Sequence, residues 1–322
     1  MELDTRALWY EAPGRATLRP GRGGDGGVVV DTLWSALSRG TERLVFEGRV
    51  PRQEFGRMRA PAQEGDFPFP VKYGYCNVGR VRDGALAGRE VFSLSPHQRG
   101  FRAAEAALSP LPEGLPARRA VLAANAETAL NALWDAGLCF GEHEGLSVTV
   151  IGAGVVGCLT AALASSVARC SVTVTDRIDK RISVANELGV KFATETAPGR
   201  SDIVFNCSAS AAGLAAGLEA LRPEGTLVEM SWHGAEPVAV PLGGAFHSQR
   251  LRIVSSQVGM VAPRARARGI DHAARLAMAL ALLRDPVYDC LITGEIGFEE
   301  LPQALPALLA PDAPGLVTVI RY

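Results

Sequence analysis

The chain has 322 residues, of which 48% are hydrophobic, and its formal net charge at pH 7 is −1. This length favours two domains with sizeable cores. The near-neutral charge gives no excess of basic residues of the kind that nucleic-acid binding requires. No apolar run is long enough to span a membrane, and the acidic start MELDTRALWYEAPG lacks an export signal. The six cysteines form no Cys-x-x-Cys pair, which argues against a zinc finger or a disulfide framework. We therefore expect a cytoplasmic protein without nucleic-acid or membrane partners.

The first 118 or so residues predict a compact β-rich domain. Short apolar segments at 28–37, 78–81 and 91–94 are typical of strands and are separated by Gly- and Pro-rich turns. A long proline-rich segment, 48–70, carries four arginines. Such a segment could contact an anionic group, or it could be an ordinary solvated loop.

The following part of the chain alternates between predicted helices and strands. The stretch 119–137 has apolar residues at helical spacing and leads to a β-branched run at 148–151. Further strands are predicted at 171–175, 202–206, 226–230 and 251–255, and helices at 179–188, 211–221, 271–283 and 301–309. Strands that alternate with helices of this length indicate an α/β fold with a doubly wound parallel sheet.

One stretch, 147–176, has the pattern of a dinucleotide-binding site. The strand enters a turn in which Gly152 permits the tight bend and Gly154 lets the backbone approach a pyrophosphate. Gly157 allows the next helix to pack close to the strand, and the helix N-terminus offers free N–H groups to the anion. Asp176 ends the second strand, where a carboxylate can accept hydrogen bonds from ribose hydroxyls. A doubly wound fold with a different nucleotide site is the alternative.

The order of these features resembles the medium-chain dehydrogenase/reductase superfamily, in its alcohol dehydrogenase-like branch related to threonine dehydrogenase. The resemblance covers essentially the whole chain and depends on the motifs GAGVVG, SRGTE, KYGYCNVGRV and ETALNAL. It implies a GroES-like catalytic domain at 1–124, a Rossmann NAD-binding domain at 125–258 and a C-terminal return to the catalytic domain at 259–322. It also implies an active site in the cleft between the domains and a homodimer.

The zinc ligands of that superfamily are replaced in this chain. Zinc-dependent members carry a Cys, a His and a second Cys at three positions that here hold Arg39, Tyr75 and either Ala124 or Asn125. Arginine and tyrosine are poor ligands for such a site. We therefore predict that the protein binds no zinc.

Four residues are candidates for the catalytic work that zinc would otherwise do. The resemblance implies that Thr41 relays the substrate proton. Tyr75 could donate a proton, with a pKa lowered by a cation such as Arg39, which itself could stabilise a developing alkoxide. His97 is a candidate general acid or base. The alternatives are that Tyr75 is a packed core aromatic, that Arg39 is an ion-pair partner in a loop and that His97 is a turn residue.

Asp176 favours NAD over NADP, because a carboxylate holds two ribose hydroxyls and repels a 2′-phosphate. Arg177 complicates this preference, and the resemblance implies that Arg181 also touches the ribose. Further cofactor contacts are expected at the helix N-terminus and at the carboxyl ends of the later strands. These residues are Val155, Val156, Cys207, Ser208, Ser231, Trp232, Ser256 and Gln257. His233 lies in the same region and could equally be polar surface.

The sequence therefore predicts a zinc-independent, NAD(H)-dependent oxidoreductase that interconverts an alcohol and a carbonyl on a small or medium organic molecule. Two alternatives stay open. An enoyl or quinone reductase would reduce C=C bonds and usually prefers NADPH, and a protein that has lost catalysis could retain only the NAD site.

Overall fold

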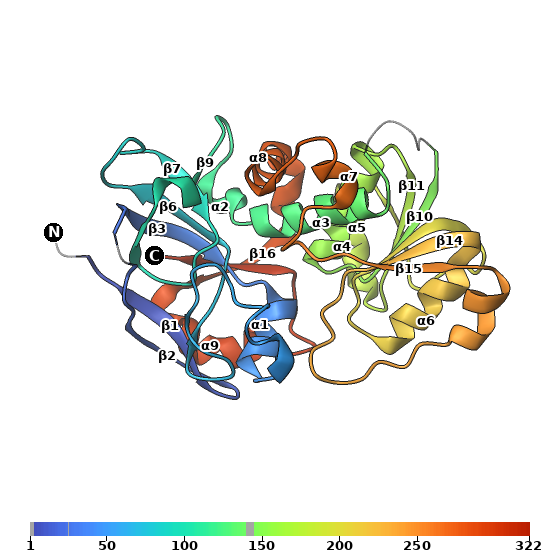
Figure 1. Cartoon of the computed structure of the whole chain (residues 1–322), viewed down its shortest axis with the longest axis horizontal. Coiled ribbons are helices and arrows are strands. Elements are labelled where there is room, and N and C mark those ends of the chain that lie inside the picture. The colour runs from blue at the N-terminus through green and yellow to red at the C-terminus, as the bar shows by residue number, and fades with distance from the viewer. Residues whose placement is uncertain (1–2, 25, 140–144) are drawn as a thin grey trace. The chain divides into compact units, whose positions relative to one another are not determined.

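The computed structural model describes residues 3–24, 26–139 and 145–322. Two compact units make up the chain (Figure 1): the first joins Met1–Ala124 to Leu280–Tyr322, and the second is Asn125–Ala279. The predicted limit at 258/259 thus lies inside the second unit. Each unit has its own sheets and core.

The first unit is built around two largely antiparallel sheets. The smaller sheet has the order β2-β1-β5-β4, and the larger has the order β16-β17-β3-β6-β7-β9, with β8 also paired to β3. Their bounds are β1 Arg6–Ala12, β2 Arg15–Pro20, β3 Val28–Ala36, β4 Glu64–Gly65, β5 Val71–Lys72, β6 Asn77–Val81, β7 Glu90–Ser93, β8 Gly100–Ala103, β9 Ser109–Pro110, β16 Ile292–Gly297 and β17 Val317–Arg321. β17 pairs with β3 in antiparallel register, so the C-terminal segment completes the sheet of the N-terminal segment.

The second unit contains a six-stranded parallel sheet, as the alternating pattern predicts. Its order is β12-β11-β10-β13-β14-β15, and the strand order reverses at β10. The bounds are β10 Ser147–Ile151, β11 Ser171–Thr175, β12 Lys191–Ala193, β13 Ser201–Asn206, β14 Leu221–Glu229 and β15 Arg252–Ser255. The α/β fold class is thereby confirmed.

The predicted helices are present with two differences, and the helices at 39–46 and 263–266 were not predicted. The predicted helix at 119–137 is divided into α2 and α3, and the one at 179–188 begins as a 3₁₀ turn, η3, before α5. The bounds are α1 Arg39–Phe46, α2 Ala117–Ala120, α3 Ala123–Asp135, α4 Val155–Ser166, α5 Ile182–Glu187, α6 Ala211–Ala220, α7 Pro263–Arg266, α8 His272–Leu282 and α9 Leu301–Leu308. Shorter turns are η1 Arg52–Glu54, η2 Glu105–Ala107, η3 Asp179–Arg181, η4 Leu242–Phe246 (a π turn), η5 Pro286–Leu291 and η6 Phe298–Glu300.

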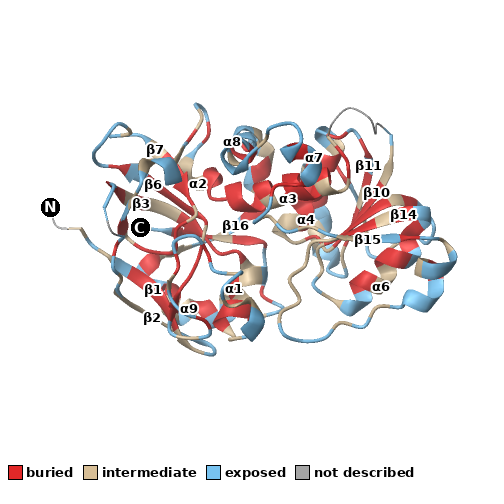
Figure 2. Ribbon diagram, in the orientation of Figure 1, coloured by how far each residue is buried: buried red, intermediate tan, exposed pale blue. Residues whose placement is uncertain are grey.

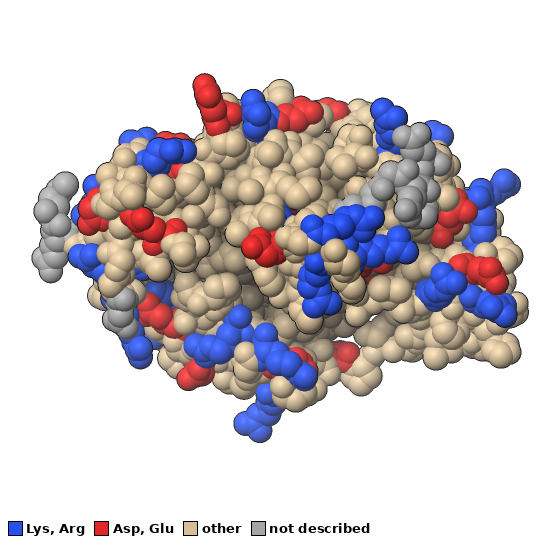
Figure 3. Space-filling view, turned by 45° about the horizontal axis from the view of Figure 1, so that its top comes forward, with Lys and Arg blue, Asp and Glu red and all other residues tan. Residues whose placement is uncertain are grey.

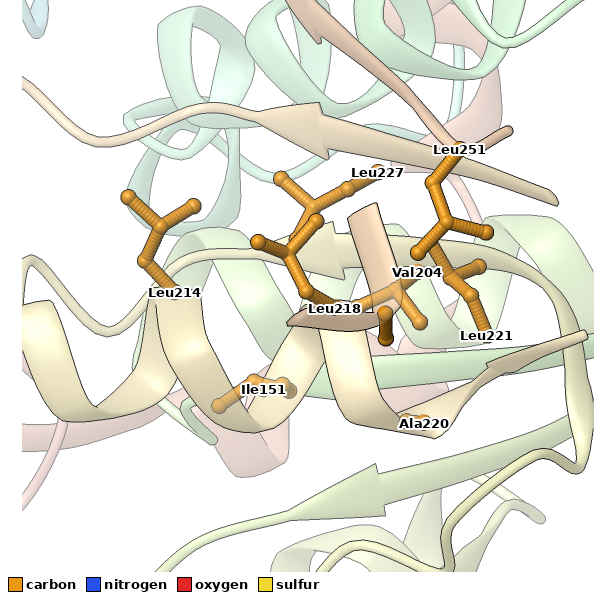
Figure 4. Packing of buried hydrophobic residues seen from close by; sticks show 9 residues of the cluster. Ile151, Val204, Leu214, Leu218, Ala220, Leu221, Leu227 and Leu251 are labelled. Atoms are coloured by element: carbon orange, nitrogen blue, oxygen red, sulfur yellow. The ribbon is translucent and has the colours of Figure 1, made fainter. Parts of the chain in front are cut away.

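Helix α6 shows how the second unit packs. Its Leu214 and Leu218 lie against Val204 of β13 and Leu227 of β14 (Figure 4). The helix can approach the sheet closely because a Cβ on Gly217 would lie only 2.7 Å from a Leu227 methyl. Buried residues line the inner strands β10 and β13 and also helices α3 and α4 (Figure 2), so these elements are packed firmly together.

Basic and acidic side chains both occur on the face shown in Figure 3, consistent with the small net charge. Within the described residues, each helix is too short or too polar to cross a bilayer.

Candidate functional site

The glycine turn after β10 has the geometry that the sequence predicts. Gly152 has a φ of +97°, a conformation that glycine adopts at little cost. A Cβ on Gly157 would lie 1.8 Å from the carbonyl oxygen of Gly152, so any side chain there would separate α4 from the turn. Both positions therefore require glycine for the fold itself.

Gly154 has a different role. It precedes the first residue of α4 and no side chain caps the helix there. A Cβ on Gly154 would meet no heavy atom within 4 Å, so the space before the helix N-terminus is open. Val155 and Val156, the first two helical residues, are half-buried. This open approach to the N–H groups of the first turn of α4, here called the cradle, suits a phosphate group.

Asp176 lies beside this turn. Its Oδ2 accepts a hydrogen bond from the backbone N–H of Ala153 at 2.8 Å, and its Oδ1 accepts one from that of Ile178 at 2.9 Å. Arg181 also donates to Oδ2, at 3.1 Å, whereas Arg177 is exposed. The carboxylate is thus fixed at the end of β11 with capacity left for ribose hydroxyls. These residues fit a dinucleotide.

The predicted contacts at the later strand ends lie in loops that hydrogen bonds hold together. The Ser231 hydroxyl accepts from the N–H of Ala209 at 3.0 Å, which links the loop after β14 to the loop after β13. Ser256, after β15, donates to Asp135 of α3 at 2.7 Å. Cys207, Ser208 and Trp232 are half-buried, whereas Gln257 is exposed.

Two residues at this edge were missed by the sequence analysis. Asn206, the last residue of β13, is fully buried, and its amide donates to Oε2 of Glu229 at 2.6 Å. Glu229 ends β14 and pairs directly with Asn206 in the sheet register. Both lie inside predicted strands, and only their polar character in otherwise apolar runs could have drawn attention to them.

In the first unit, His97 belongs to a buried polar network that the sequence did not predict. Its Nε2 lies 2.9 Å from Oε2 of Glu42, and its Nδ1 lies 2.8 Å from the hydroxyl of Ser35. Ser35 in turn lies 2.8 Å from the hydroxyl of Tyr322, and Tyr10 donates to Glu42 at 2.8 Å. Both ring nitrogens of His97 are therefore occupied.

Glu42 anchors helix α1 within this network. Its Oε1 accepts a hydrogen bond from the backbone N–H of Ser38, the residue that precedes the helix, at 2.7 Å. Burial disfavours the charged carboxylate, but His97 and the hydrogen bonds from Ser38 and Tyr10 outweigh it and hold the pKa of Glu42 below its ordinary value. Glu42 is thus a fully buried carboxylate that favours the ionised form.

Thr41 and Tyr75 are brought together beside α1. The Tyr75 hydroxyl donates to the hydroxyl of Ser38 at 2.7 Å and also interacts with the side chain of Thr41. Burial raises the pKa of Tyr75 well above its ordinary value, with Cys76 acting in the same direction. The lowering that Arg39 was expected to cause is therefore wrong, and Tyr75 keeps its proton at neutral pH.

Arg39 faces the segment before β17. Its guanidinium donates to the carbonyl oxygens of Ala313, Pro314 and Gly315 at 2.7, 3.2 and 2.9 Å. A guanidinium engaged in this way, a protonated phenol and an Ala–Asn pair at the remaining position do not fit a zinc ion. Among the residues that the structure describes, no group of three or more His, Cys, Asp or Glu side chains is placed to hold a metal.

The arginines of the segment 48–70 mostly have acidic neighbours. Arg49 pairs with Glu47 at 3.1 Å, Arg57 pairs with Glu54, and Arg59 pairs with Asp66. These exposed local pairs favour the solvated-loop interpretation.

No protein-family model matches the chain, and no curated protein matches it in sequence. Solved structures do match its fold. A short-chain alcohol dehydrogenase from Escherichia coli, complexed with NADH, has a TM-score of 0.78 at 15% identity over 100% of both chains. L-idonate 5-dehydrogenase from Escherichia coli has a TM-score of 0.79 at 15% identity, covering 100% of this chain and 99% of that one. The yhdH oxidoreductase from Salmonella enterica, in complex with NADP, has a TM-score of 0.71 at 20% identity, covering 98% and 99%. The chain therefore has the fold of alcohol dehydrogenase-like enzymes.

Proposed function

We propose that this chain is an NAD(H)-dependent oxidoreductase that interconverts an alcohol and a carbonyl on a small or medium organic substrate without zinc. The observation that carries the proposal is the cradle at Gly154 beside the fixed carboxylate of Asp176. Of the three fold neighbours named above, one is described in complex with NADH and another in complex with NADP.

The preference for NAD follows from the charge at the end of β11. A 2′-phosphate would meet the carboxylate of Asp176, which is 12% exposed. Arg181 already forms an ion pair with that carboxylate at 3.1 Å, so the positive charge of Arg181 is partly compensated. Arg177 is the cation left to attract a phosphate, and its exposure weakens its effect.

A bound nicotinamide would supply or accept the hydride, and the chain's own residues would hold the dinucleotide and handle the proton. Gly154 and the first turn of α4 would receive the pyrophosphate, and Asp176 would accept hydrogen bonds from the ribose. Thr41 and Tyr75 are the side chains that we propose to hold and move the proton of the substrate hydroxyl. Tyr75, with its raised pKa, serves as a donor in this scheme.

His97 and Arg39, predicted as catalytic residues, remain predictions in that role. In this proposal they position other groups. His97 orients Glu42, which holds the start of α1, and Thr41 is the third residue of that helix. Arg39 ties α1 to the segment 313–315 through three backbone carbonyls.

A screen for NADH and NADPH consumption across aldehydes, ketones, enones and quinones tests the proposal. Turnover of aldehydes or ketones with NADH supports it. Turnover of only enones or quinones with NADPH would establish the C=C reductase instead, and dinucleotide binding without any turnover would indicate a protein that has lost catalysis.

Metal analysis of protein purified without a His tag tests zinc independence, which stoichiometric zinc would overturn. A homodimer is part of the proposal by analogy of fold, and light scattering measures it.

A further inference from the structure

The carboxylate of Glu229 is held in one place at the end of β14. Its Oε2 accepts from the Asn206 amide at 2.6 Å, and its Oε1 accepts from the backbone N–H of Ser231 at 2.8 Å. The Asn206 side chain is itself oriented, because its carbonyl oxygen accepts from the hydroxyl of Ser208 at 2.7 Å. The side chain of Glu229 is 15% exposed, so it is neither free to turn away nor fully solvated.

No arginine or lysine neutralises this carboxylate within the described part of the chain. Its one basic neighbour is His233, whose Nε2 lies 3.6 Å from Oε1. That nitrogen is buried and forms no hydrogen bond with the described residues. Glu229 is therefore a carboxylate held by two hydrogen bonds, with no arginine or lysine paired to it among the described residues.

The sheet order indicates which part of a dinucleotide would lie over this charge. Dinucleotides bind across the carboxyl edge of such a sheet, at the point where the strand order reverses. Asp176 directly follows β11, on one side of β10, and would take the adenosine ribose, while the turn after β10 would take the pyrophosphate. The nicotinamide half must then continue to the other side, over the ends of β13 and β14, where Asn206 and Glu229 are paired.

We propose that Glu229 is a specificity-determining residue whose carboxylate favours the oxidised, positively charged nicotinamide ring over the reduced, neutral ring. The inference rests on the proposed function and adds to it a preference between the two redox forms of the cofactor. The physical reason is Coulombic: a fixed, partly buried negative charge attracts the cationic ring and has no equivalent attraction for the neutral one. The hydrogen bonds from Asn206 and Ser231 keep the charge at the strand end.

Equilibrium binding of NAD⁺ and NADH, measured by calorimetry at pH 8 without substrate, tests the inference. In Glu229→Gln we expect the affinity for NAD⁺ to fall about tenfold, while the affinity for NADH stays within about twofold. Glu224→Gln is the matched control, because Glu224 belongs to the same strand, is 62% exposed and pairs with Arg250. This control is expected to change neither affinity.

A second variant separates charge from structure. In Glu229→Gln alone, the new side chain would present its NH₂ group to the Asn206 amide, whereas in Asn206→Asp/Glu229→Gln an aspartate would accept from both the glutamine and Ser208. We expect this double variant to keep the preference for NAD⁺, because the charge moves by only one strand. An equal fall of both affinities in Glu229→Gln, or a double variant that binds NADH without preferring NAD⁺, would overturn the inference. If the unmodified chain binds neither form, the proposed function fails together with it.

Discussion

The imidazole Nε2 of His97 lies 2.9 Å from Oε2 of Glu42, and both side chains are fully buried. Breaking a buried pair of this kind leaves a polar group without its partner, which costs more than the pair itself contributes. The fold of the first unit therefore depends on keeping His97 and Glu42 paired. This pair lies next to the hydroxyl groups that we propose to move protons.

Replacing Glu42 by glutamine is expected to lower the free energy of unfolding by about 2–3 kcal/mol at pH 7. The pKa of Glu42 is below its ordinary value of 4.5 in the folded chain, so its ionised form stabilises the fold above that pH. The contribution declines as the pH falls below 4.5 and is lost below the lowered pKa, so the difference in stability between the two proteins should be smaller at pH 4 than at pH 7. Urea unfolding at pH 7 and pH 4 measures this.

The control for this substitution is Glu47→Gln, just after α1, where the carboxylate is 35% exposed and pairs with Arg49. It is expected to change stability by less than about 0.5 kcal/mol. A Glu42→Gln protein as stable as the unmodified chain at pH 7 would contradict the anchoring role.

The two glycines of the turn should respond differently to alanine. Gly157→Ala places a methyl group against the Gly152 carbonyl oxygen and should destabilise the second unit by about 3 kcal/mol. Gly154→Ala meets open space, so the melting temperature should change little while NADH affinity falls at least about tenfold. Thermal melts and fluorescence titrations distinguish the two. Unchanged NADH affinity in Gly154→Ala would argue against the cradle.

Asp176→Asn tests cofactor choice. Removing the charge at the end of β11 should weaken NADH binding by about tenfold and should reduce the discrimination against NADPH, because the 2′-phosphate no longer meets a carboxylate. Parallel fluorescence titrations with both cofactors measure the change. Asp179→Asn, at the exposed first residue of η3, is the control and should bind like the unmodified protein. Tighter binding of NADPH than NADH by the unmodified chain would refute the preference.

Tyr75→Phe is expected to reduce kcat about 100-fold with a substrate found in the screen, if its hydroxyl donates the proton. Thr41→Val should have a comparable effect, and Thr41→Ser should restore most of the rate. Because the pKa of Tyr75 is raised, its donation should not titrate away up to about pH 9.

Tyr73→Phe provides the comparison for Tyr75. Tyr73 is also buried. Its ring lies edge-on to that of Tyr75, with 6.0 Å between the ring centroids. Loss of its hydroxyl should leave kcat near that of the unmodified chain. Full activity in both Tyr75→Phe and His97→Ala would refute the proton-transfer scheme.

The sequence predicted the local geometry of the glycine turn and of Asp176 better than the network around His97, and distance along the chain explains the difference. Gly152, Gly154, Gly157 and Asp176 act within one strand–turn–helix–strand unit, so their spacing contains most of the geometry. The network around His97 joins residues that are 55 and 62 positions apart, and Ser35 meets Tyr322 across 287 positions. No local pattern reports such contacts.

The polar residues at the strand ends could not be predicted from the sequence for a different reason. Asn206 and Glu229 each end a strand, and their importance comes from the parallel register that aligns them. A single chain read in order shows two isolated polar residues, 23 positions apart. The same reasoning missed β12, which has three residues and is therefore shorter than the patterns that predict strands.

The place of β17 between β16 and β3 governs the order in which the protein can assemble during synthesis. β3 and β17 are separated by the whole of the second unit, whose sheet connects strands that are close in sequence. The second unit can therefore complete its sheet while β17 has still to be translated, whereas the larger sheet of the first unit must wait for it. Until then the edge of β3 that β17 will cover is unpaired, so the first unit is the part of the nascent chain most exposed to mispairing.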